Sequence, residues 1–276
     1  MYSAIFSRTY PMKDPAEVFA AAARDGYQGV QANLSSAGLD SLPAMISPGI
    51  ALRFGEEARA KGIRIAALSG TYNMAHPDPK VRQASRIGFR NVVQAASEIG
   101  TAIVSLCTGS RDEYDQWRFH PDNSSTAAWR DLRSELDFAL ELAQESGVRL
   151  GIEPEPANVV CDARAARRIL DEVASSHLGI VLDAANLLSP ATLGLQQKLM
   201  NEATDLLGDS LLLAHAKDLD AFGRVVAPGE GAVDLLAFTK ALRSVGYDDA
   251  LIAHGFSADK AGVAARVIEH LIGESA

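Results

Sequence analysis

The chain of 276 residues is 47% hydrophobic and 22% charged, so it has enough apolar side chains for a folded core and lacks the composition of a disordered protein. Its net charge of −9 disfavours nucleic acid as a partner, because binding a phosphate backbone depends on clustered Lys and Arg. Two cysteines, the lack of a long apolar run and an N-terminus unlike a signal peptide predict a cytoplasmic protein that neither crosses nor anchors in a membrane.

Short strand-like runs alternate with longer amphipathic segments from one end of the chain to the other. The first amphipathic segment, DPAEVFAAAARDG, has the signals of a helix: Asp14 is placed to cap its start, Pro15 occupies its first turn and Gly26 follows its end. Every strand-like run is followed by such a segment. The eight expected strands cover residues 3–7, 29–34, 63–69, 102–107, 149–153, 179–183, 211–215 and 250–254.

Eight units of one strand and one helix, with no segment left over, predict a (β/α)8 TIM barrel that forms a single domain over residues 1–276. A doubly wound open sheet is the alternative, because a count of strands does not prove that the sheet closes. This alternative is disfavoured, since no G-x-G-x-x-G turn follows the first strand. In a barrel, the loops at the carboxyl ends of the strands carry the functional site.

Two loops at that end of the expected barrel are much longer than the roughly 2 to 6 residues usual there. Residues 108–125 follow the fourth strand, and residues 217–234 follow the seventh. The first loop predicts a lid or a wall of the substrate site. In the second, Gly223, Gly229 and Gly231 allow tight turns of the backbone close to a ligand.

Acidic and histidine side chains stand at the ends of neighbouring strands. Glu153, Asp183 and His215 end the fifth, sixth and seventh strands, so we expect them to meet at the mouth of the barrel. Two carboxylates and an imidazole suit a divalent cation such as Mn²⁺, Mg²⁺, Co²⁺ or Zn²⁺, and His254 from the eighth strand is a candidate fourth ligand. Taken singly, each carboxylate could instead cap a helix or lie in solvent, and His215 could be a core histidine that binds backbone groups.

The same loops supply candidates for catalysis and substrate binding. Glu155 follows Glu153 by one strand period, and Lys217 follows His215 in the same way, where it could hold a substrate oxygen or pair with a carboxylate. Cys107 has no paired base that would activate it, and we interpret it as a packing residue. The residues expected to contact substrate are His76, Arg111, Trp117, Asn158, Asn186 and Arg224. The two arginines are the better candidates for a phosphate, whereas the histidine and the tryptophan could have structural roles alone.

Several motifs occur in a recognisable order: GIEPE on the fifth strand, VLDAAN on the sixth, HAKD on the seventh, GEGAVD before the seventh helix and GYDDALIAHG at the eighth strand. In these motifs the chain resembles the xylose isomerase-like sugar phosphate isomerase/epimerase superfamily of TIM barrels over nearly its whole length. The resemblance implies a metal held by Glu153, Asp183 and His215, with a fourth ligand from the eighth strand. Epimerases of this superfamily usually carry a glutamate there, and this chain has His254. It also has Asn186 where a histidine often contacts substrate.

The resemblance and the candidate residues predict a metal-dependent isomerase or epimerase of a small sugar, keto-sugar or sugar phosphate that works through an enediolate. Glu155 and His254 are the candidates for the proton-transferring group, and His254 could be a ligand instead. The alternatives are a metal-dependent lyase or dehydratase acting on a keto-sugar or inosose and a sugar-binding barrel without catalysis. An endonuclease IV-like activity is disfavoured by the acidic charge. The superfamily suggests a homodimer or homotetramer.

Overall fold

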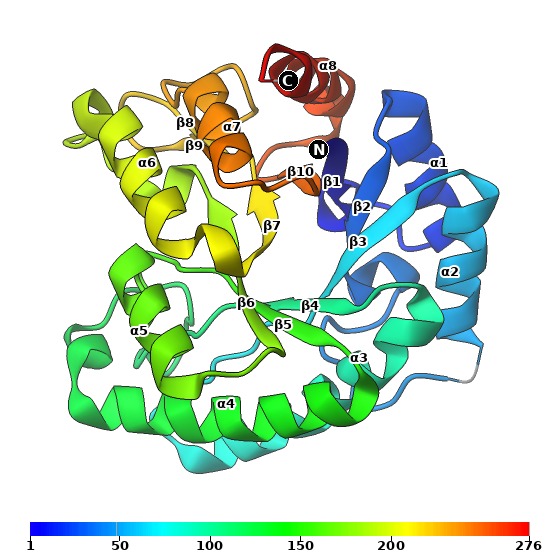
Figure 1. Ribbon diagram of the computed structural model, residues 1–276. Coiled ribbons are helices and arrows are strands. Elements are labelled where there is room, and N and C mark those ends of the chain that lie inside the picture. The colour runs from blue at the N-terminus through cyan, green and yellow to red at the C-terminus, as the bar shows by residue number, and fades with distance from the viewer. Residues whose placement is uncertain (48, 276) are drawn as a thin grey trace.

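The computed structural model describes residues 1–47 and 49–275, so positions 48 and 276 of the predicted domain lie outside the described residues. Its centre is a closed barrel of eight parallel strands, which confirms the predicted (β/α)8 fold (Figure 1). The open sheet is excluded, because β1 pairs in parallel with both β10 and β2. Around the barrel the strands are β1 (Tyr2–Phe6), β10 (Ala250–Ala253), β7 (Leu211–His215), β6 (Leu178–Asp183), β5 (Arg149–Ile152), β4 (Ile103–Leu106), β3 (Arg64–Ser69) and β2 (Gly29–Ala32).

Helices surround the barrel, and capping side chains set where many of them start. Asp14 accepts a hydrogen bond from Ala16 N, and Gly26 ends the same helix in the left-handed conformation with a φ of 99°, as the sequence predicts. Asp or Ser side chains cap four further helices in this way and so fix where the loops of the barrel mouth end. The helices are α1 (Pro15–Asp25), α2 (Ile50–Ala60), α3 (Pro79–Ile99), α4 (Thr126–Ser146), α5 (Ala163–Val173), α6 (Gln196–Leu207), α7 (Leu235–Ser244) and α8 (Ala261–Glu274). In the described part of the chain, none of them has both the length and the apolar character of a membrane span.

Alternate strand residues fill two separate layers of the core. Val181 and Ile252 belong to the cluster inside the barrel, whereas Leu251 belongs to the larger cluster between the strands and the helices. Side chains of a strand alternate between its two faces, so a residue two positions beyond an interior residue also points inward. Asp183 and His254 follow Val181 and Ile252 by this spacing, and both are therefore directed toward the barrel axis.

The loop between β7 and α7 contains a small antiparallel hairpin, β8 (Asp218–Leu219) and β9 (Val225–Val226), that the sequence pattern does not predict. The buried carboxylate of Asp218 holds this loop together. It accepts hydrogen bonds of 2.8–3.1 Å from four backbone N–H groups, those of Leu219, Gly229, Gly231 and Val233. The close packing requires glycine at position 231, because a Cβ atom there would lie 2.1 Å from Asp218 Oδ1. The loop is therefore a fixed wall of the barrel mouth.

We predict that Asp218→Ala lowers the free energy of unfolding by about 3 kcal/mol, because it leaves backbone N–H groups of the loop without their charged acceptor. Urea denaturation measures the loss, and limited proteolysis locates it in residues 217–234. Asp205→Ala, on the exposed surface of α6, is the matched control and is expected to change stability by less than about 0.5 kcal/mol. Equal stability of the two variants would contradict this role of Asp218.

Candidate functional site

Four side chains meet at the mouth of the barrel, one from each of four neighbouring strands. They come from the ends of β5, β6, β7 and β10 and are, in that order, Glu153, Asp183, His215 and His254. Each offers one ligand atom, and these atoms lie within 4.8 Å of one another. The first three residues are buried and His254 is partly buried, so this four-residue group lies below the rim of the barrel. The structure thus brings together all the residues that the sequence suggests as metal ligands.

Within the four-residue group, each carboxylate faces an imidazole. Asp183 Oδ2 lies 3.0 Å from His254 Nε2, and Glu153 Oε1 lies 3.3 Å from His215 Nδ1. Burial opposes ionisation of Asp183, but Lys217 and the two histidines outweigh burial and lower the pKa of this carboxyl group. In Glu153 burial is likewise outweighed, mainly by His215, and the pKa is lowered. Burial and the neighbouring His215 lower the pKa of His254, which favours its neutral form.

Lys217, Asn186 and Glu155 lie directly beside the four-residue group. Lys217 Nζ lies 2.7 Å from Asn186 Oδ1, 3.1 Å from Asp183 Oδ2 and 3.8 Å from Glu155 Oε1. Asn186 also donates a hydrogen bond of 3.2 Å to Glu153 Oε1, so it links the ammonium group to a carboxylate. Burial and the charge of Glu153 raise the pKa of Glu155 to about 7, although Lys217 opposes the shift.

Gln31, a buried residue in β2, was not predicted as part of the site. Its Oε1 lies 2.7 Å from His215 Nε2, and its Nε2 donates to Ser105 Oγ at 3.0 Å. With the amide in this orientation, Gln31 Oε1 accepts the Nε2–H of His215, and Nδ1 of the imidazole faces Glu153. In the sequence, the polar Gln31 stands out within the strand GVQA. Its partner His215 lies 184 positions further along the chain, so the sequence does not indicate the contact.

Both arginines that the sequence suggests for a phosphate have carboxylate partners in the protein. Arg111 is buried and donates to Asp131 Oδ2 at 2.9 Å and to Ala75 O at 3.1 Å. Arg224 lies in the loop between β8 and β9, has a side chain 74% exposed and is 2.7 Å from Asp220 Oδ2. A role in substrate binding stays a prediction for both arginines.

The remaining candidates lie in the loops around the mouth. Asn158 Oδ1 accepts a hydrogen bond of 2.7 Å from the backbone of the loop between β4 and α4, and His76 Nε2 lies 3.2 Å from Glu113 O of that loop. Trp117 lies in the same loop and is half-exposed. Cys107 is buried, and burial raises the pKa of its thiol, in agreement with a packing role. Substrate contacts of Asn158, His76 and Trp117 stay predictions.

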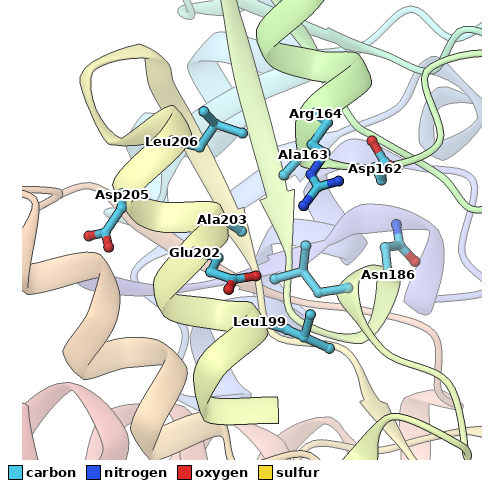
Figure 2. Close-up of a pocket in the computed structure, with 10 residues that line it drawn as sticks. Asp162, Ala163, Arg164, Asn186, Leu199, Glu202, Ala203, Asp205 and Leu206 are labelled. Carbon is cyan, nitrogen blue, oxygen red and sulfur yellow. The ribbon is translucent and has the colours of Figure 1, made fainter. Parts of the chain in front are cut away.

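Two cavities open near the four-residue group. The first has a volume of about 590 Å³ and is lined by His254 together with residues of β9 and the loops after β1 and β10. The second, of about 540 Å³, lies between the start of α5 and one face of α6, as Figure 2 shows. Asn186 is on the wall of the second cavity and also contacts Glu153 and Lys217. Of the two cavities, the first includes a member of the four-residue group.

The fold and the four-residue group define a TIM barrel with a possible metal site on its carboxyl-terminal face. The family model described as "Xylose isomerase-like TIM barrel" matches residues 19–272, and the chain belongs to this family. The resemblance noted in the sequence is thereby confirmed. A comparison with curated proteins gives no match.

Solved structures with this fold align with nearly the whole chain. The IolI protein with a bound zinc atom has 17% identity and a TM-score of 0.76, and the alignment covers 100% of this chain and 99% of that one. D-allulose 3-epimerase from Methylomonas sp. in complex with D-allulose has 16% identity and a TM-score of 0.77 over 99% and 97%. The apo form of 3-keto-D-glucoside 4-epimerase, YcjR, from E. coli has 16% identity and a TM-score of 0.75 over 98% and 98%. At these identities the likeness establishes the fold, and function has to be argued from the site.

Proposed function

We propose that this protein is a divalent-metal-dependent isomerase or epimerase that acts on a small keto-sugar through an enediolate. The observation that carries the proposal is the four-residue group at the barrel mouth, with Glu155 and Lys217 beside it. The proteins of similar fold that are named as epimerases of D-allulose and of 3-keto-D-glucosides support the same class of substrate. A cytoplasmic location and a homodimer or homotetramer stay predictions.

The donor atoms of the four-residue group fit a divalent cation. Nδ1 of His215 lies 3.3 Å from an oxygen of Glu153 and 3.8 Å from an oxygen of Asp183. Because all three atoms carry lone pairs, they repel one another unless a proton or a cation lies between them. Two imidazoles among the donors favour Mn²⁺, Co²⁺ or Zn²⁺ over Mg²⁺, which prefers oxygen ligands throughout. The zinc atom in the similar IolI structure is in keeping with this choice.

Glu153, Asp183, His215 and His254 would hold the cation, which when bound would supply positive charge that favours an enediolate over the neutral keto-sugar. Glu155 removes the proton from the carbon beside the carbonyl and returns it, since its carboxyl group borders the four-residue group without belonging to it. Lys217 donates a hydrogen bond to a substrate oxygen from the same wall, and Asn186 keeps its ammonium group in position. Lys217 is buried and Glu155 is partly buried, with a side chain 21% exposed, which limits the access of bulk water to the proton transfer.

Of the two reactions, we propose isomerisation rather than epimerisation. His254 has the position of a ligand, because its Nε2 lies inside the four-residue group, 3.0 Å from Asp183 Oδ2. Glu155 is then the remaining carboxyl group in contact with Lys217 among the described residues. One base can carry a proton between neighbouring carbons on one face of an enediolate, whereas inversion of a carbon requires a second group on the opposite face.

Elemental analysis of the purified protein is expected to find about one divalent ion per chain, because the four-residue group forms one site. Asp183→Ala is expected to lose the ion, and Asp205→Ala on the exposed surface of α6 is expected to keep it. Circular dichroism of both variants checks that the barrel is folded. A parent protein without metal after incubation with Mn²⁺, Co²⁺ or Zn²⁺ would rule out the proposed function and favour a sugar-binding barrel.

Gln31→Leu is expected to lower metal affinity by roughly 10–100-fold, because His215 then loses the acceptor that turns its Nδ1 toward the carboxylates. Competition with a fluorescent chelator measures this affinity. Gln28→Leu, at the exposed position just before the same strand, is the control and should bind metal as the parent does. If the two variants bind metal equally well, Gln31 does not orient the ligand.

Glu155→Gln tests the chemistry. We expect it to retain metal and sugar binding while the rate of proton exchange into keto-sugars in D₂O falls by about 10² to 10⁴-fold, because the base is lost. Nuclear magnetic resonance follows the exchange, and calorimetry follows binding. Unchanged exchange would exclude Glu155 as the base. Loss of water from the substrate in the parent would identify a lyase, and binding without any turnover would identify a non-catalytic barrel.

A further inference from the structure

The cavity next to His254 has two positive side chains on its wall, Arg8 and Lys260, and no carboxylate. Its volume of about 590 Å³ lies within the roughly 300–1,000 Å³ of small-molecule sites. The whole chain has a net charge of −9, and two of its carboxylates, those of Glu153 and Asp183, lie close by in the four-residue group. The wall of this cavity therefore carries positive side chains at the mouth of an acidic protein, which favours an anionic ligand.

The fold fixes Arg8 close to His254. In the register of β1 and β10, Ile5 lies opposite Ala253, so the residues that follow, Phe6 and His254, leave the barrel side by side. Their rings are 6.4 Å apart in an edge-to-face arrangement. Arg8 lies two positions beyond Phe6, in the 3₁₀ turn Ser7–Thr9.

The turn that carries Arg8 is anchored by buried hydrogen bonds. The hydroxyl oxygen of Ser7 accepts a hydrogen bond of 2.9 Å from Asn33 N and one of 2.8 Å from Ser36 Oγ, and all three residues are buried. Because the backbone is held in this way, the guanidinium is presented from a rigid support.

Neither cation on the cavity wall has a buried partner that would compete with a ligand. Within residues 1–47 and 49–275, Arg8 is exposed and forms no hydrogen bond or ion pair through its side chain. Lys260 Nζ lies 2.5 Å from Glu230 Oε2, but the side chain of Glu230 is 42% exposed and does not line the cavity. The planar guanidinium matches the oxygens of a phosphate in a bidentate manner.

We propose that this cavity binds a terminal phosphate of the substrate, so that the protein acts on keto-sugar phosphates. The carbonyl end of the sugar lies at the four-residue group, and the phosphate lies against Arg8 and Lys260. The loops after the seventh and eighth barrel strands, which form much of the cavity, are frequent phosphate sites in TIM barrels. The position of the sugar in this inference rests on the proposed function, and the position of its phosphate rests on Arg8.

Proton exchange in D₂O, measured for ketopentoses and ketohexoses as free sugars, terminal phosphates and terminal carboxylates, tests this proposal. The parent is expected to show the highest kcat/KM with the phosphates. Arg8→Gln is expected to lower the ratio of kcat/KM for phosphorylated over free sugar by roughly 10–100-fold. This change corresponds to the loss of one or two charge-assisted hydrogen bonds to the phosphate. Arg149→Gln, which removes the same charge at the opposite, amino-terminal end of the barrel, is expected to leave the ratio as in the parent.

Three results would overturn the phosphate site: an equal or higher kcat/KM for free sugars, a preference for sugar carboxylates, or a ratio in Arg8→Gln equal to that in Arg149→Gln. In each of these cases proton exchange occurs and the proposed function stands. If no sugar undergoes proton exchange, the proposed function fails. Titration with inorganic phosphate, followed by ³¹P nuclear magnetic resonance, then tests whether the cavity binds phosphate. Phosphate binding that is lost in Arg8→Gln and kept in Arg149→Gln supports the site, and binding that is equal in both variants overturns it.

Discussion

The parallel pairing of β1 with β10 closes the barrel, and the arrangement of the mouth depends on it. Closure brings the loop after the first strand next to the loop after the last, so Phe6 and Arg8 become neighbours of His254. It also lets Gln31 reach across the interior from β2 to His215 on β7. An open sheet of the same strands would separate these residues, and neither the support of the imidazole nor the cavity would exist.

Two buried aspartates near the barrel mouth, Asp218 and Asp183, have different roles because their carboxylates have different hydrogen-bond partners. Asp218 accepts hydrogen bonds from four backbone N–H groups, which leave it little capacity for anything else. Asp183 accepts one from Ala185 N and otherwise faces an ammonium group and imidazoles. The first carboxylate is satisfied by the backbone and shapes a loop, whereas the second keeps oxygen lone pairs directed at the interior of the mouth.

The sequence was sufficient for the barrel and for the four-residue group, because both follow from local patterns. Strand runs that end on Glu, Asp and His are visible without knowing the fold, and the strand period then decides which way Asp183 and His254 point. The partners of Gln31 and Arg111 could not be read from the sequence. Gln31 meets His215 across the barrel, and Arg111 meets Asp131 from a helix, so both contacts exist only once the strands and helices have packed. The β8–β9 hairpin was missed because its strands have two residues each.

The four members of the possible metal group all come from β5 and the strands that follow it in the chain. The last of them, His254, reaches its place only when β10 has inserted between β7 and β1. A nascent polypeptide can therefore assemble the carboxylates of Glu153 and Asp183 well before the imidazole of β10 has left the ribosome. An ion that requires all four donors would select the fully closed barrel over every partly synthesised form, and its capture would then coincide with the end of folding.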